Sequence, residues 1–222
     1  MGSTITLTAS DGHQFSAYKA GPANATAGVV VIQEIFGVNH HIRNMADRLA
    51  AEGFLAIAPA LFDRAERGVE LGYTGDDVAA GRALRGKVPD AGAMLDVEAA
   101  ATALGGIPAG IVGYCYGGTI AWWGATRTNA FKAASGWYGG GVAGTAGEQP
   151  SCPVQLHFGE KDTGIPISDV DKVRAAQPGV EIYLYPGAQH GFGCDERASF
   201  SAPDAALAQS RTVTFFRKLL MI

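Results

Sequence analysis

The sequence has little of what several large protein classes need. Of its 222 residues only three are cysteines, Cys115, Cys152 and Cys194. An odd number of cysteines with no close pair argues against a disulfide framework and is typical of a reducing compartment. Three thiols also cannot make a four-thiolate zinc site. We therefore expect a cytoplasmic protein with free thiols.

Charge and long apolar runs are scarce too. Charged residues make up 17% of the chain, the net charge is −4, and no basic run occurs. A nucleic-acid surface needs clustered Lys and Arg, so no nucleic-acid partner is expected. No stretch is apolar over the length of a bilayer, and the N-terminus lacks the features of a signal peptide, so no membrane partner is expected. The length suits one domain over residues 1–222, and 47% apolar residues allow a large core.

The chain does contain alternating strand and helix patterns. Residues 5–9 and 14–19 alternate apolar and polar around Asp11-Gly12, which predicts an N-terminal hairpin. Residues 28–33 are an almost unbroken apolar run, typical of a strand buried on both faces of a parallel sheet. Further strands are expected at 54–58, 110–114, 132–137, 154–158 and 180–185, and helices around 42–49, 89–104, 119–127 and 201–220. This order predicts an α/β fold with a mostly parallel sheet and helices on both faces.

The least regular stretch, residues 63–87, carries much of the local charge. Irregular charged segments at the edge of such a fold often cover a binding site. We expect this stretch to form a flap.

Residues 113–118 (GYCYGG) lie between a predicted strand and a predicted helix. A nucleophile elbow turns so sharply that the positions two before and two after the nucleophile must be small, and Gly113 and Gly117 occupy them. Cys115 would also sit at a helix N-terminus, where the helix dipole favours a thiolate. Taken alone, the motif fits a buried structural cysteine almost as well.

Two later residues strengthen the catalytic interpretation of Cys115. Asp162 follows the predicted strand 154–158, and His190 follows the strand 180–185. This is the order nucleophile, acid, base of the α/β-hydrolase triad. Asp162 would orient His190, which would take the proton from Cys115. Each residue alone is an ordinary loop residue, but the three types in this order predict a triad.

Residues 33–37 (QEIFG) follow an early strand, at the position that supplies an oxyanion-hole N–H in this fold. We expect the two donors to be the backbone N–H groups of Ile35 and Tyr116. Glu34 beside that hole either contacts the thiol or belongs to a structural ion pair. The sequence leaves both possibilities open.

Residues 33–37, 113–118, Asp162 and residues 187–192 (GAQHGF) together resemble the dienelactone hydrolase family over nearly the whole chain. The resemblance implies a three-layer α/β-hydrolase fold and carboxymethylenebutenolidase-type hydrolysis of a small lactone or activated ester through a thioester, without a cofactor. It also implies that Glu34 holds the resting thiol and exchanges partners when substrate binds.

The sequence departs from the best-known members of that family, which bind the substrate carboxylate with two arginines. The position four residues after His190 is Cys194, and Arg197 comes three residues later. The other arginine has no clear match, so a clamp of Arg82 and Arg197 is a hypothesis and the substrate stays open. Four aromatic residues could line either the pocket or the core: Phe36, Tyr73, Trp137 and Tyr138.

Other patterns are weaker. The glycines at 139, 141 and 144 match a dinucleotide fingerprint by letter, but no helical pattern follows them. His40 and His41 lack partner ligands at metal spacing, so we expect capping or solvent exposure there and no metal site. Trp122 and Trp123 are expected in the core.

Two rival functions remain. A non-catalytic binding protein could keep the fold, and it would show no preferential alkylation of Cys115. A redox-sensing thiol protein would need a resolving cysteine, for which Cys194 is the candidate, and mild oxidation would then form a reversible disulfide.

Overall fold

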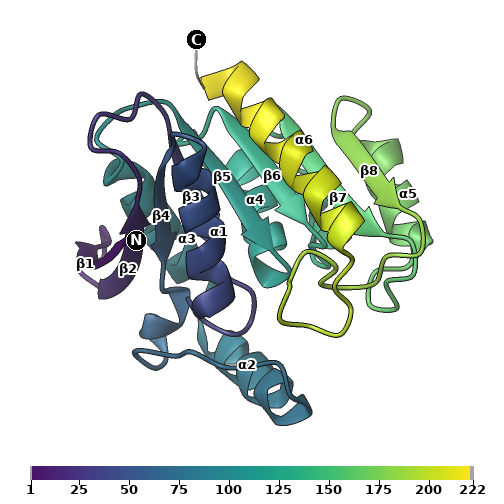
Figure 1. Ribbon diagram of the computed structural model, residues 1–222, viewed down its shortest axis with the longest axis horizontal. Helices are drawn as coiled ribbons and strands as arrows, with labels where there is room; N and C mark the ends of the chain where they lie inside the picture. The colour runs from purple at the N-terminus through teal and green to yellow at the C-terminus, as the bar shows by residue number, and fades with distance from the viewer. Residues whose placement is uncertain (1, 221–222) are drawn as a thin grey trace.

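In the computed structural model, which describes residues 2–220, eight strands form one sheet in the order β1-β2-β4-β3-β5-β6-β7-β8 (Figure 1). The strands are β1 (Ser3–Thr8), β2 (Gln14–Ala20), β3 (Gly28–Ile32), β4 (Leu55–Pro59), β5 (Ala109–Tyr114), β6 (Ala133–Trp137), β7 (Val154–Gly159) and β8 (Glu181–Tyr185). Met1 and residues 221–222, which belong to the expected domain 1–222, lie outside the described residues.

The strand pairing confirms the predicted fold class. β1 and β2 form the antiparallel hairpin, and β2 also pairs antiparallel with β4. The remaining pairs, from β4 through β8, are parallel. Gly12 takes a φ of 85° in the hairpin turn, which favours glycine.

Helices cover both faces of the sheet. They are α1 (His40–Ala51), α2 (Gly75–Lys87), α3 (Asp90–Thr102), α4 (Tyr116–Arg127), α5 (Ile167–Ala176) and α6 (Ala202–Leu220), with short 3₁₀ turns η1 (Leu61–Arg64) and η2 (Val142–Thr145). Figure 1 shows α1 and α6 in front of the sheet, with α3 and α4 behind it. Among residues 2–220, no helix is both long and apolar enough to span a bilayer.

The stretch 63–87 contains a helix that its sequence pattern does not reveal. Only Gly81 and Leu84 of α2 are buried, so the helix has almost no apolar stripe. Its first turn is fixed by a capping box between Thr74 and Asp77. A Cβ on Gly81 would lie 2.1 Å from the carbonyl oxygen of Ile35, so the glycine allows α2 to approach the loop after β3.

The sheet positions the site through the carboxyl ends of its parallel strands. Every residue of β3, β5, β6 and β7 is buried, which makes these strands a rigid base. The loop after β3 carries Glu34, the turn after β5 carries Cys115, and the loop after β7 carries Asp162. The loop after β8 carries His190, so the predicted residues converge at one edge of the sheet.

Candidate active site

Cys115 sits in a strained turn between β5 and α4. Its φ and ψ are 55° and −113°, a conformation that non-glycine residues rarely adopt. A Cβ on Gly113 would lie 1.9 Å from the carbonyl oxygen of Gly117, and one on Gly117 would lie 2.4 Å from that of Ile32. Both neighbours are backbone atoms, so only glycine fits at these two positions.

His190 connects Cys115 to Asp162. The Nε2 atom of His190 lies 3.1 Å from Cys115 Sγ, and its Nδ1 lies 2.7 Å from Asp162 Oδ2. The other oxygen of Asp162 accepts hydrogen bonds from the backbone N–H groups of Gly164 (2.8 Å) and Ile165 (3.2 Å). These bonds fix the orientation of the buried Asp162 side chain and, through it, that of His190.

The surroundings of His190 favour its charged form. Burial works against the charge, but the hydrogen bonds to Asp162 and Cys115 outweigh it and raise the pKa of His190 to about 10. The buried ring of Tyr138 packs edge-on against the imidazole, with ring centroids 5.2 Å apart. The Nε2 atom of this imidazole faces Cys115 Sγ.

A cavity of about 630 Å³ opens over Cys115. It is mixed in character, with apolar walls and three arginine side chains. The residues from the sequence prediction that line it are Ile35, Phe36, Arg82, Cys115, Tyr116, Asp162, His190 and Arg197. The lining also includes Val78, Arg85, Thr119, Trp123 and Ile165, which the prediction did not include.

Of the four aromatic residues left open between pocket and core, only Phe36 lines the cavity. Trp137 and Tyr138 lie in the core, where the indole N–H of Trp137 donates to Thr212 Oγ1 at 3.1 Å. Tyr73 packs edge-on against Phe36 and is not part of the cavity wall. Trp137 and Tyr138 lie at the end of β6, a position that is compatible with the pocket, but their side chains are buried in the core.

Trp123 is buried in the core, as expected, and it also contributes to the cavity wall. Cys115, Thr119 and Trp123 are spaced four residues apart, so they lie along one face of α4 below the elbow. That spacing is the sequence signal that could have identified Thr119 and Trp123 as pocket residues.

The backbone N–H groups of Ile35 and Tyr116 lie at this cavity. Tyr116 is the first residue of α4, where N–H groups have no partner inside the helix. Within residues 2–220, the N–H of Ile35 donates no hydrogen bond either. Both groups are therefore available for a substrate oxygen.

Glu34 lies behind the cavity and is fully buried. Its Oε1 lies 3.4 Å from Arg197 Nη1, while the Cys115 thiol contacts His190. The guanidinium of Arg197 also lies 5.8 Å from the ring centroids of Phe36 and Tyr73. Of the two contacts considered for Glu34, the structure shows the ion pair.

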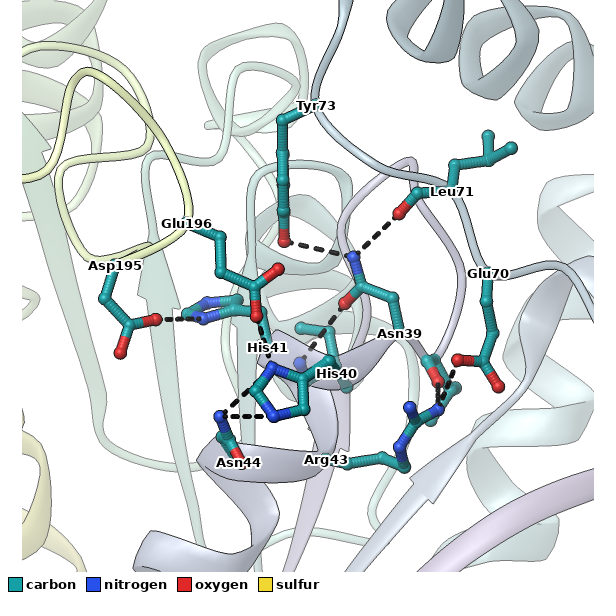
Figure 2. Close-up of polar contacts among 12 residues, drawn as sticks. Asn39, His40, His41, Arg43, Asn44, Glu70, Leu71, Tyr73, Asp195 and Glu196 are labelled. Atoms are coloured by element: carbon teal, nitrogen blue, oxygen red, sulfur yellow. Dashed lines mark hydrogen bonds and ion pairs between the residues drawn. The ribbon is translucent and has the colours of Figure 1, made fainter.

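Of the two histidines at the start of α1, His40 is exposed as expected and His41 is not (Figure 2). Asn39 caps the helix, with its side chain accepting from the N–H of Ile42. His40 is exposed and pairs with Glu196, whereas His41 is fully buried beside Asp195. The interpretation of His41 as capping or exposed was wrong, because the loop after His190 folds back over the start of α1.

Comparison with known proteins agrees with this geometry. Residues 15–220 match the model of the dienelactone hydrolase family. The chain belongs to the dienelactone hydrolase family. It is 38% identical over 209 residues to a Synechocystis sp. protein named "Putative carboxymethylenebutenolidase", covering 85% of each chain. A protein of that name from Azospirillum brasilense is 36% identical over 228 residues, covering 97% of this chain and 98% of its own.

A solved structure extends the match to three dimensions. The Klebsiella pneumoniae protein named "Putative Dienelactone Hydrolase" superimposes with a TM-score of 0.83 at 35% identity. The match covers 97% of this chain and 99% of that one. The predicted family and its α/β-hydrolase fold are confirmed, and this chain is a hydrolase of the family.

Proposed function

We propose that Cys115 is the nucleophile of a Cys-His-Asp triad that hydrolyses a small lactone or activated ester. The observation that carries this proposal is the hydrogen-bonded line Cys115–His190–Asp162 at the wall of the cavity, with contacts of 3.1 and 2.7 Å. A nucleophile, a base within reach and a group that orients the base are the requirements for covalent catalysis.

The first half-reaction forms a thioester. The Cys115 sulfur attacks the acyl carbon while its proton is held on Nε2 of His190, in the charged form that the surroundings of the imidazole favour. The N–H groups of Ile35 and Tyr116 bind the oxyanion. The C–O bond then breaks, and His190 returns the proton to the leaving oxygen, which stays attached to the acyl group when the substrate is a lactone.

The second half-reaction regenerates the thiol. Water attacks the thioester carbon while His190 takes a proton from it. The C–S bond breaks, the acid leaves, and the proton returns to the sulfur. Lactones and activated esters suit a thiol nucleophile, because their leaving oxygens need less protonation than the amine of a peptide.

The arginines on the cavity wall favour a substrate with an acidic group. Arg197 is paired with Glu34, and Arg85 lies beside Asp90 and over the Tyr116 ring. Arg82 is exposed and makes no ion pair within residues 2–220. We therefore keep Arg82 and Arg197 as the candidate clamp, with Arg197 shared between Glu34 and substrate.

The helix α2 is the element best placed to act as the flap expected at residues 63–87. Val78, Arg82 and Arg85 extend from it into the cavity wall. We propose that residues 2–220 act as one domain with α2 as this cover. The free state of all three cysteines supports a reducing, cytoplasmic setting.

Turnover of p-nitrophenyl acetate and of a dienelactone by wild type and Cys115→Ala tests the nucleophile. We expect the variant to lose activity on both substrates, and equal rates would end the assignment. Arg82→Ala should lower kcat/KM on the acidic dienelactone while sparing the neutral acetate. A reversible Cys115–Cys194 disulfide after mild oxidation would favour the redox function instead.

A further inference from the structure

A second cluster of reactive side chains lies behind the catalytic cavity. One ligand atom each of Glu34, His41 and Cys194 lies within 4.8 Å of the other two. All three residues are fully buried. They come from the loop after β3, the first turn of α1 and the loop after β8, so the fold brings together positions that are far apart in the sequence.

Two atoms of this cluster lack hydrogen-bond partners within residues 2–220. They are Oε2 of Glu34 and Nε2 of His41. The other ring nitrogen of His41, Nδ1, lies 3.4 Å from Asp195 Oδ1 (Figure 2). Since a carboxylate only accepts, this contact favours the proton on Nδ1 and leaves a lone pair on Nε2.

The buried interior therefore holds a carboxylate oxygen and a ring nitrogen that are both acceptors. Leaving such groups unsatisfied is costly. A bound cation would satisfy such acceptors, and Cys194 supplies a third ligand atom to the cluster.

The donor set matches a specific class of cation. Sulfur, imidazole nitrogen and carboxylate oxygen are the ligands that zinc takes at about 2.0–2.3 Å. Ligands of a tetrahedral site lie ~3.5 Å apart, a separation inside the 4.8 Å that bounds the distances among these three atoms. The Asp195–His41 contact is the carboxylate–histidine pair that orients metal-binding imidazoles.

The charges also balance. A divalent cation with the Cys194 thiolate, the Glu34 carboxylate and a neutral His41 has no net charge. A free thiol with its ordinary pKa of about 8.5 is protonated at neutral pH. Metal binding must release that proton. Arg197 lies on the opposite oxygen of Glu34, Oε1, and leaves Oε2 free for the metal.

We propose that Glu34, His41 and Cys194 form a binding site for a zinc-class divalent transition-metal ion. The ion would tie the loop after β3 and the start of α1 to the loop that carries Arg197. It would also fix Oε2 of Glu34, while Oε1 of the same carboxylate pairs with Arg197. Cys115, the proposed nucleophile, is not one of its ligands, whereas Glu34 connects the site to Arg197 of the candidate clamp.

Cobalt titration of the chelator-treated full chain tests this site, because a thiolate–Co²⁺ bond gives a near-ultraviolet charge-transfer band. We expect one Co²⁺ per chain, displaced by Zn²⁺, with the band kept in Cys115→Ser and Cys152→Ser and lost in Cys194→Ser. Asp195→Asn should weaken binding roughly 10–100-fold. Circular dichroism of each variant checks that it folds.

Proton release by the wild type is a second measurement, which does not depend on whether a variant folds. Binding of Zn²⁺ in weak buffer at pH 7 should release about one proton per ion from Cys194. The proposal is overturned if the wild type binds neither Co²⁺ nor Zn²⁺ stoichiometrically, or if Zn²⁺ binding releases no proton. It is also overturned if the band survives in Cys194→Ser, or disappears in Cys115→Ser, which would place the ion at the catalytic thiol.

Discussion

Replacing Asp162 by Asn changes one atom of the proposed triad and should disable it through the tautomer of His190. Asp162 Oδ1 accepts from the backbone N–H groups of Gly164 and Ile165, and Oδ2 faces His190 Nδ1 at 2.7 Å. In Asp162→Asn the side chain has one carbonyl oxygen, which must accept the hydrogen bonds from the N–H groups of Gly164 and Ile165. The amide NH₂ therefore turns toward Nδ1, which must become an acceptor. The imidazole proton moves to Nε2, opposite the thiol.

The structure also indicates how firmly this arrangement is held. Flipping the amide would face its NH₂ toward two backbone donors, and each unsatisfied buried N–H costs about 1–3 kcal/mol. Ile165 is buried and Gly164 is exposed, so the flip costs at least ~1–3 kcal/mol for the Ile165 N–H, enough to keep the wrong tautomer dominant. In a Ser-His-Asp triad the same substitution lowers kcat about 10⁴-fold for this reason. Here we expect kcat/KM to fall by about 10³-fold, which corresponds to a loss of ~4 kcal/mol of transition-state stabilisation.

The assay is kcat/KM for p-nitrophenyl acetate, measured beside the melting temperature. Asp171→Asn is the matched control, because Asp171 is an exposed carboxylate on α5 that pairs only with Arg174 among residues 2–220. A loss smaller than about tenfold in Asp162→Asn, with a folded protein, would refute the assigned role of Asp162.

Three further predictions concern the elbow, the imidazolium and the thiols. Gly117→Ala should lower the melting temperature and reduce kcat/KM by about 10²-fold, because its Cβ meets two backbone carbonyls, whereas Gly144→Ala, with open space at its Cβ, should do neither. The free energy of unfolding should fall as the pH rises from about 6.5 to about 10, because folding raises the pKa of His190. The stability that the charged imidazole contributes is fully present only below the ordinary histidine pKa. Urea titrations that show no such fall would contradict the pairing of His190 with Asp162. Iodoacetamide at pH 8 should alkylate Cys115 first, because burial raises the pKa of Cys152 to about 11 and that of Cys194 to about 12. About 0.1% or less of either thiol is then present as thiolate. Equal labelling of the three cysteines would favour a non-catalytic protein.

The parts of the fold that the sequence predicts are those with strong local signals. The apolar run of β3 and the glycines around Cys115 identify a buried strand and a sharp turn without any other information. The helix α5 has no such signal, since Val170 and Val173 are its only buried residues. Its helical pattern is too short to distinguish from a loop.

In the candidate site, too, some residues are predictable from local sequence signals and others are not. Asp162 and His190 are predictable because each directly follows a strand of a parallel sheet. The proximity of His41 to Cys194 is not predictable, because it depends on the path of an irregular loop that returns over α1 from about 150 residues away. The inward turn of Trp137 and Tyr138 depends on packing that no local pattern encodes.

The central claim is that Cys115 carries the acyl group during turnover. Mixing the enzyme with p-nitrophenyl acetate, quenching in acid within one turnover and mapping the peptides by mass spectrometry tests it directly. We predict an acetyl group on the peptide that contains Cys115, absent in Cys115→Ala and accumulating in a variant with slow deacylation. Full turnover with no acyl group on Cys115, or with the acyl group on another residue, would contradict the account.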